Sequence, residues 1–166
     1  MTNNTILQVR GLKKYYGKGE TEVRALDGVD LDIERGKFTA IIGTSGSGKS
    51  TLLNMLGGLD TPSAGSIKVG DTELAKLNSE QATIFRRKQI GFIFQNYNLV
   101  PVLSVWENII FPISLDGRKP DKTFIMQVVK LLGLEKKLDS VPNNLSGGRQ
   151  QRVAIARALA SKPSII

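Results

Sequence analysis

The sequence contains no cysteine and no histidine. Without cysteine, the chain can form no disulfide framework and no thiolate metal site. Without histidine, it lacks the usual imidazole base and metal ligand. No apolar run approaches the roughly 18–20 residues of a membrane span, and the N-terminus lacks the basic-then-apolar layout of a secretion signal. We therefore expect a soluble, cytosolic chain that takes any membrane role through a partner.

The 166 residues are enough for one domain with a core, and they carry a net charge of +8 from 23 Lys and Arg against 15 Asp and Glu. An excess of this kind can indicate nucleic-acid binding. Here, however, the positive residues are scattered, with short clusters only at Lys13–Lys14 and Arg86–Lys88, and no aromatic residues interleave them as a stacking platform. We expect no direct contact with nucleic acid.

The segment Gly43–Thr51 (GTSGSGKST) matches the phosphate-binding pattern G-x-x-x-x-G-K-[ST] at every defined position. The apolar run Phe38–Ile42 before it predicts a buried strand, and Thr51–Leu56 predicts a helix. Between such elements, backbone N–H groups point into one concavity and bind phosphate oxygens, and the positive end of the helix faces the same phosphates. The predicted nucleotide ligands are Gly43, Thr44, Ser45, Gly46, Ser47, Gly48, Lys49, Ser50 and Thr51.

Two of these side chains have separate expected roles. Lys49 reaches the terminal phosphates of ATP, and the Ser50 hydroxyl binds Mg²⁺. The loop alone does not distinguish kinases, GTPases, helicases and transport ATPases.

A second glycine motif makes that distinction. Leu145–Arg152 (LSGGRQQR) resembles the signature of the ATP-binding cassette (ABC) family, with Arg149 where the family more often has glutamine. We expect Ser146 to cap a helix over Arg149–Ala160. The resemblance implies that Ser146, Gly147 and Gly148 contact the γ-phosphate of ATP held by the phosphate-binding loop of a second subunit, in a head-to-tail dimer.

Three further segments fit the same family. Ile90–Phe94 reads as a strand before Gln95, which resembles the family's glutamine that faces Mg²⁺ and water and links the core to the membrane subunit. Tyr16 in KKYYG resembles the aromatic residue that stacks on adenine, with Tyr15 as the second choice, and packing on neighbouring β-structure as the alternative for either. The loop Asn96–Pro101 resembles the surface that receives a transmembrane permease. The alternative is that it packs on its own helical lobe.

The resemblance implies an α/β fold: an ABC-type P-loop core with an antiparallel β lobe and a helical lobe. We expect the β lobe and core over residues 1–95, the helical lobe over 96–160, and the start of another strand over 161–166. Sequence patterns predict strands at Ile6–Arg10, Val29–Ile33 and Gly65–Val69, and helices at Ser79–Lys88, from the capping box Ser104–Glu107, and at Lys122–Leu132.

The family's acidic residues for Mg²⁺ and water activation follow four aliphatic residues soon after the signature helix. Ser164–Ile166 resembles the beginning of that run, which we expect to lie beside the phosphate-binding strand. We therefore expect a domain that is incomplete at its C-terminus. We also expect this chain to bind ATP without useful turnover, because it lacks the Walker B Asp, the catalytic Glu and the switch His.

Within the family, Phe85–Ile109 and Gly43–Asp60 resemble the lipoprotein-release and macrolide-export subgroup, whose relatives also serve resistance to antimicrobial peptides. The expected function is that of the ATP-binding subunit of an ABC transporter, peripheral at the inner face of the membrane through a permease. Two alternatives remain: a soluble ABC ATPase that acts on nucleic acid or the ribosome, and another P-loop kinase or NTPase. The signature motif argues against the last.

Overall fold

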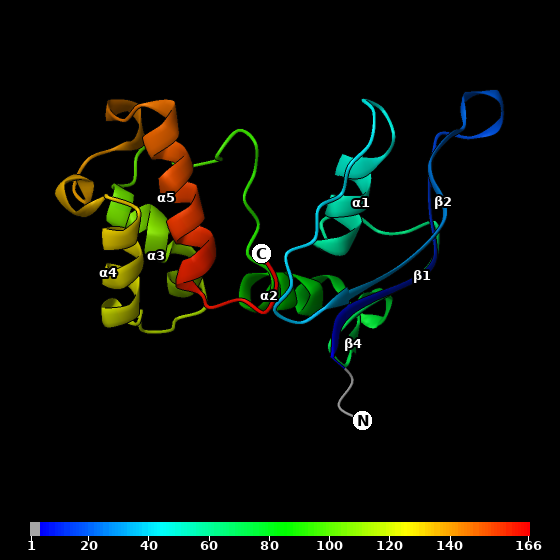
Figure 1. Cartoon of the computed structure of the whole chain (residues 1–166), viewed down its shortest axis with the longest axis horizontal. Coiled ribbons are helices and arrows are strands. Elements are labelled where there is room, and N and C mark those ends of the chain that lie inside the picture. The colour runs from blue at the N-terminus through cyan, green and yellow to red at the C-terminus, as the bar shows by residue number, and fades with distance from the viewer. Residues whose placement is uncertain (1–3) are drawn as a thin grey trace. The chain divides into compact units, whose positions relative to one another are not determined.

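The computed structural model describes residues 4–166 and divides them into two units, one ending at Ala82 and one formed by Thr83–Ile166. The first unit contains the sheet and α1, and the second contains most of the helices (Figure 1). The proposed division into family lobes at Gln95 stays a prediction.

An antiparallel sheet of order β2-β1-β3-β4 forms the first unit. Its strands are β1 (Thr5–Tyr16), β2 (Val23–Glu34), β3 (Ala64–Val69) and β4 (Thr72–Glu73). The three predicted strands are confirmed, and β1 and β2 extend well beyond the predicted ends. The register of β1 shifts between Val9 and Leu12, where Gly11 has a φ of +54°. This bulge adds a residue and leaves both Val9 and Leu12 fully buried.

Helix α1 (Lys49–Leu56) follows the phosphate-binding loop, and short 3-10 turns lie at Gly19–Thr21 and Leu74–Lys76. The helix buries Leu52, Met55 and Leu56, so its apolar side completes the core of the first unit. The predicted helix is confirmed and begins earlier than expected.

The predicted buried strand at Phe38–Ile42 is wrong. These residues form no regular element, and the side chains of Phe38 and Ile42 are 97% and 89% exposed. A strand is held by the hydrogen-bond ladder of its neighbours. No described residue of 4–166 forms such a ladder with this run, so its apolar composition alone does not make it a strand.

The second unit is built on α2 (Ser79–Gln89), which crosses the boundary, and on α3 (Val105–Leu115), α4 (Lys122–Leu131) and α5 (Gly147–Ala160). Short 3-10 turns lie at Glu135–Lys137 and Pro142–Asn144. Helices α3, α4 and α5 lie side by side (Figure 1). Their shared core comprises Val105, Ile109, Ile113, Ile125, Val128, Val129, Leu134, Leu145, Val153, Ala156 and Ala160.

Helix starts in this unit follow the sequence signals. The Glu107 N–H donates to Ser104 Oγ at 3.2 Å, and the Ser104 N–H donates to Glu107 Oε2 at 2.7 Å, which confirms the capping box of α3. Asp121 caps α4 by accepting from the Phe124 N–H at 3.0 Å. The predicted helices at Ser79–Lys88 and Lys122–Leu132 are confirmed to within one residue.

The two remaining predicted strands form only one parallel bridge, between Ile90 and Ile165. The Gly91 N–H donates to the Ile165 carbonyl at 2.8 Å, and Ser164 N–H donates to the Gln89 carbonyl at 3.0 Å. Within the second unit, the backbone of Ser164–Ile166 therefore pairs with the segment before Gln95. The expectation that this run also lies beside the phosphate-binding segment of the first unit stays a prediction.

None of the helices within residues 4–166 combines the length and the apolar composition that crossing a membrane requires.

Candidate nucleotide-binding site

The phosphate-binding loop lies exposed between the irregular run 38–42 and α1. Gly46 and Gly48 have φ values of +80° and +85°, a backbone conformation that is unfavourable for residues with a Cβ. A Cβ at Gly48 would also lie 2.4 Å from the Ala25 carbonyl oxygen of β2. Glycine at position 48 therefore lets the loop turn into α1 against the sheet.

The Lys49 ammonium folds back over its own loop. Its Nζ donates to the carbonyl oxygens of Gly43 at 3.0 Å and Thr44 at 2.5 Å, and lies 3.4 Å from Ser47 Oγ. The positive charge thus lies over the glycine-rich turn, next to the N-terminus of α1, where backbone N–H groups and the helix dipole favour an anion. An incoming phosphate would exchange these carbonyl contacts for a charge-assisted bond.

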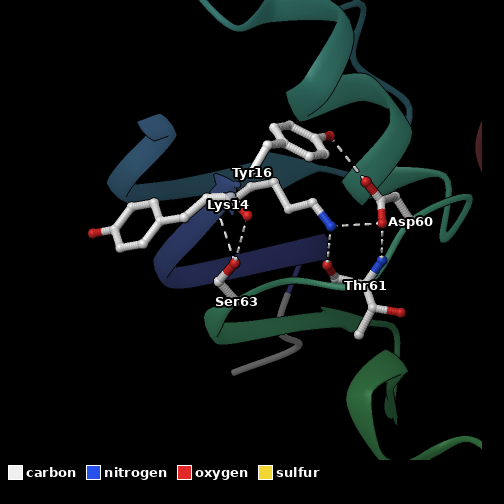
Figure 2. A network of polar contacts seen from close by, with 6 residues as sticks. Lys14, Tyr16, Asp60, Thr61 and Ser63 are labelled. Carbon is white, nitrogen blue, oxygen red and sulfur yellow. Dashed lines mark hydrogen bonds and ion pairs between the residues drawn. The ribbon is translucent and has the colours of Figure 1, made fainter. Parts of the chain in front are cut away.

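Tyr16, the predicted adenine platform, lies at the end of β1 with 43% of its surface exposed. Figure 2 shows its hydroxyl donating to Asp60 Oδ2, at 3.0 Å. Lys14 donates to Asp60 Oδ1 at 2.7 Å and to the Thr61 carbonyl at 2.8 Å, and its ammonium lies 4.9 Å from the centre of the Tyr16 ring. The Thr51 side chain of α1 lies close enough to the phenol to act on its pKa, in the lowering direction. The structure therefore places Tyr16 against the helix of the phosphate-binding loop.

This cluster changes the acidity of its members. Burial, followed by the hydrogen bond to Asp60, raises the pKa of Tyr16, so the ring stays neutral. Burial also acts to raise the pKa of Asp60, but the hydrogen bonds from Lys14, the Thr61 N–H and Tyr16 together outweigh it, and the pKa is lowered. Asp60 therefore remains an anion that anchors Lys14 and Tyr16.

Tyr15 points to the other face of β1. Its hydroxyl hydrogen-bonds Asp27, and the Arg24 guanidinium lies 5.2 Å from the centre of its ring. Of the two tyrosines, Tyr16 is the one that the structure brings to α1.

The signature residues form an exposed turn at the start of α5, which begins at Gly147, two residues earlier than predicted. Ser146 occupies the N-cap position, and its carbonyl accepts from the N–H groups of Arg149 at 2.8 Å and Gln150 at 2.9 Å. The predicted side-chain cap is wrong, because the Ser146 hydroxyl makes no capping hydrogen bond. The backbone alone closes the first turn, and the hydroxyl remains exposed.

Gln150 fixes the approach to this turn. Its Nε2 donates to the carbonyl oxygens of Pro142 and Leu145, each at 3.1 Å. A Cβ at Gly148 would meet no heavy atom within 4 Å, so the space over the turn is open. The arrangement leaves a hydroxyl, helix N–H groups and the neighbouring Arg149 facing solvent, a set that suits an anion.

Gln95 lies exposed in a turn after the bridge residue Ile90. In the loop that follows, Leu99 packs against the helical core, as does Trp106 at the start of α3, whereas Val102 is 82% exposed. Part of the predicted permease surface thus packs against the helices of its own chain, which was the alternative interpretation of this loop.

Sequence reasoning missed two residues that position these segments, Asp60 and Arg157. Asp60 accepts hydrogen bonds from Lys14 and Tyr16, and the Arg157 guanidinium binds the carbonyl oxygens of Tyr97 and Asn98. A signal existed for Arg157: it is a charged residue within the apolar and alanine-rich run of α5.

Within residues 4–166, no group of three or more acidic, histidine or cysteine side chains is arranged to hold a metal ion. The proposed Mg²⁺ ligands are the hydroxyl of Ser50, in the first unit, and the amide of Gln95, in the second. Both are exposed oxygen donors of the hard type that Mg²⁺ accepts alongside phosphate and water. Their role as ligands stays a prediction.

Comparison with known proteins identifies the family. The model described as "ABC transporter" matches residues 26–166. The chain is 45% identical over 163 residues to a macrolide export ATP-binding/permease protein, MacB, of Bdellovibrio bacteriovorus, covering 97% of this chain and 25% of that protein. It is 41% identical over 169 residues to the lipoprotein-releasing system ATP-binding protein LolD of Alcanivorax borkumensis, covering 100% of this chain and 74% of that protein.

Solved structures agree. The dimeric bacterial ABC transporter cassette MJ0796 superposes with a TM-score of 0.86 at 40% identity, covering 95% of this chain and 70% of that one. The same cassette in a dimeric post-hydrolysis state with ADP and Pi gives 0.85. The chain belongs to the ABC transporter family, and the predicted α/β P-loop fold of ABC type is confirmed. It spans about a quarter of the MacB relatives and about three quarters of LolD.

Proposed function

We propose that this chain is the ATP-binding subunit of an ABC transporter of the macrolide-export and lipoprotein-release type. In this proposal, the loop Gly43–Thr51 holds the ATP phosphates, Lys49 leaves its carbonyl contacts for the terminal phosphates, and Tyr16 stacks on adenine. The observation that carries nucleotide binding is the position of the Lys49 ammonium over an exposed glycine loop at the start of α1. The Tyr16–Asp60 bond supports the adenine role, because it holds a half-exposed ring beside the same helix.

Bound Mg²⁺ would neutralise charge on the phosphates, with Ser50 and Gln95 as ligands from this chain. Ser50 directly follows Lys49 in α1, and the residue is exposed. Gln95 would orient water and transmit the presence of phosphate to the loop that follows it.

We propose further that two copies assemble head to tail. Ser146, Gly147 and Gly148 of one copy would then close over the ATP in the other copy. The uncapped Ser146 hydroxyl and the open space over Gly148 support this role, because both leave the turn free to approach a phosphate. Names among the relatives add support: MJ0796 is described as dimeric, and MacB combines ATP-binding and permease functions in one name.

A transmembrane permease would dock near Asn96–Pro101, at the inner face of the membrane. Val102 supports this location, because it is 82% exposed next to that loop. We expect Val102→Asp to reduce co-purification with a candidate multi-span permease of the macrolide-export or lipoprotein-release type. The exposed Leu131→Asp, on α4, is the control. Equal recovery of the permease with both variants would refute docking at this loop.

Nucleotide binding is tested by titrating ATP and Mg²⁺ into the 166-residue chain and following heat or fluorescence of Trp106, its single tryptophan. We expect Lys49→Ala to lower the affinity by at least about a hundredfold, equivalent to losing a charge-assisted contact of about 2.7 kcal/mol. Lys76→Ala, a surface lysine paired with Glu73, is the matched control and should bind as the wild type does. Equal affinity of the Lys49 and Lys76 variants would refute the site.

A further inference from the structure

The loop after Gln95 has an unusual backbone. Tyr97 and Asn98 have φ values of +58° and +46°, although neither is glycine. Local hydrogen bonds support the turn: the Tyr97 N–H donates to the Phe94 carbonyl at 3.1 Å, and the Asn98 N–H to the Asn96 carbonyl at 2.6 Å. Two adjacent left-handed residues are costly, and they persist only where surrounding groups hold them.

The Arg157 side chain supplies that hold. One guanidinium nitrogen donates to the Asn98 carbonyl at 2.6 Å, and the other donates to the Tyr97 carbonyl at 2.7 Å. Left-handed φ values at both residues bring the two carbonyls within reach of one planar fork, which an ammonium could not match. The guanidinium is half-buried, and this desolvation lowers the pKa of Arg157 without removing its charge.

The loop also approaches the other end of the same helix. A Cβ at Gly147 would lie 3.2 Å from the Tyr97 hydroxyl, so this hydroxyl lies next to the signature turn. Gly147 and Arg157 are ten residues apart in α5, which corresponds to roughly 15 Å along the helix axis. Tyr97 therefore contacts α5 near its start through the phenol and near its end through the carbonyl.

We propose that Arg157 is a positioning residue that locks the Gln95–Asn98 loop onto the signature helix, so that the signature turn and the loop move as one body. The inference rests on the proposed function. When a second copy's nucleotide occupies the turn at Ser146–Gly148, the loop that follows Gln95 is stabilised as well. Arg157 thereby ties nucleotide occupancy in the partner copy to the segment expected to face the permease.

Arg152 offers a matched control on the same helix. It donates one hydrogen bond to the Leu132 carbonyl, at 3.1 Å, and so holds a different loop. Removing either guanidinium deletes the same chemistry from α5, but only Arg157 contacts the loop after Gln95.

The test is amide hydrogen exchange of the 166-residue chain, read by mass spectrometry over peptides covering residues 92–101. Without nucleotide, we expect Arg157→Gln to speed exchange at Tyr97 and Asn98 roughly tenfold, Arg157→Lys to give an intermediate increase, and Arg152→Gln to leave these amides unchanged. The Lys variant keeps the charge and most of the side-chain volume, so it decides the point if the Gln variant fails to fold. Unchanged exchange in both Arg157 variants, or an equal increase in Arg152→Gln, would overturn the proposal.

A second arm adds saturating ATP and follows self-association by analytical ultracentrifugation. In the wild type, ATP-driven dimers should slow exchange of residues 95–98. In Arg157→Lys, dimers should form with this protection reduced by at least about threefold. Equal protection in the two proteins would overturn the coupling. If the wild type binds ATP but does not dimerise, the proposed head-to-tail assembly is refuted. The first arm, which needs no nucleotide, still tests whether Arg157 holds the loop after Gln95.

Discussion

The Tyr16 hydroxyl donates a 3.0 Å hydrogen bond to Asp60, 44 residues further along the chain. The bond joins the end of β1 to the segment that follows α1, and Lys14 strengthens it by binding the other carboxylate oxygen. The tyrosine expected to stack on adenine is therefore fixed relative to the helix that begins at Lys49. The geometry of the proposed nucleotide site therefore depends on one carboxylate outside the phosphate-binding motif.

Stability should therefore depend on the ionisation of Asp60. Its pKa is lowered in the folded chain, so folding favours the carboxylate over the acid. The resulting stabilisation is fully present above the unfolded pKa of about 3.9, and it is lost as the pH falls through the lower folded pKa. Urea unfolding of the wild type and Asp60→Asn should show a stability difference at pH 7 that shrinks below about pH 4. A difference independent of pH would contradict this.

Local signals account for what the sequence predicted well. The capping box of Ser104 and Glu107 and the apolar spacing of Ile125, Val128 and Val129 in α4 involve residues within one or two turns. Such patterns fix a helix with little help from the rest of the fold. The phosphate-binding loop is equally local, because its glycines are required by the turn itself.

Long-range contacts account for what the sequence did not predict. Phe38–Ile42 has the composition of a buried strand, but a strand exists only with a paired neighbour, which the run itself cannot specify. The strand β1 continues past Arg10 through a bulge at Gly11 that interrupts the alternation of apolar residues. Likewise, Arg157 and the carbonyl of Tyr97 are 60 residues apart, and no local pattern pairs them.

The two N-cap serines, Ser104 and Ser146, are expected to have different roles, the first in stability and the second in closing over nucleotide. The Ser104 hydroxyl accepts a capping bond, whereas the Ser146 hydroxyl accepts none. Ser104→Ala should therefore cost about 1 kcal/mol of unfolding free energy and leave ATP-driven dimerisation intact. Ser146→Ala should change stability by less than about 0.5 kcal/mol and weaken dimerisation by at least about tenfold. Chemical denaturation and sedimentation in ATP measure the two effects. The reverse pattern would show that Ser146 acts in folding.

The phosphate-binding loop offers a comparison of two glycines with similar φ. At Gly46 an added Cβ meets nothing within 4 Å, so Gly46→Ala should cost only the left-handed strain, about 1–2 kcal/mol. At Gly48 the same Cβ meets the Ala25 carbonyl oxygen at 2.4 Å, and either the loop or β2 must shift. Gly48→Ala should cost roughly 3 kcal/mol or more. Equal midpoints of urea unfolding for the two variants would rule out this close approach.

Asn108 is fully buried on α3, and its amide satisfies the backbone of the preceding loop. Its Oδ1 accepts from the Val100 N–H at 2.8 Å, and its Nδ2 donates to the carbonyl oxygens of Val100, Leu103 and Ser104, each at 3.0 Å. Asn108→Leu keeps the approximate volume but removes the side-chain partner of the Val100 N–H and the Leu103 carbonyl, whereas the Val100 and Ser104 carbonyls still accept from the N–H groups of Leu103 and Asn108.

We expect Asn108→Leu to lower the free energy of unfolding by about 3 kcal/mol, since each unsatisfied buried polar group costs about 1–3 kcal/mol. Gln127→Ala, which removes an exposed amide from α4, should stay within about 0.5 kcal/mol of the wild type. Amide exchange over residues 100–104 should speed up in the Asn108 variant alone, because the loop loses the side chain that holds it. If both variants unfold at the same urea concentration as the wild type, the prediction fails. The loop at residues 100–104, which includes the exposed Val102, is then held by contacts other than those of Asn108.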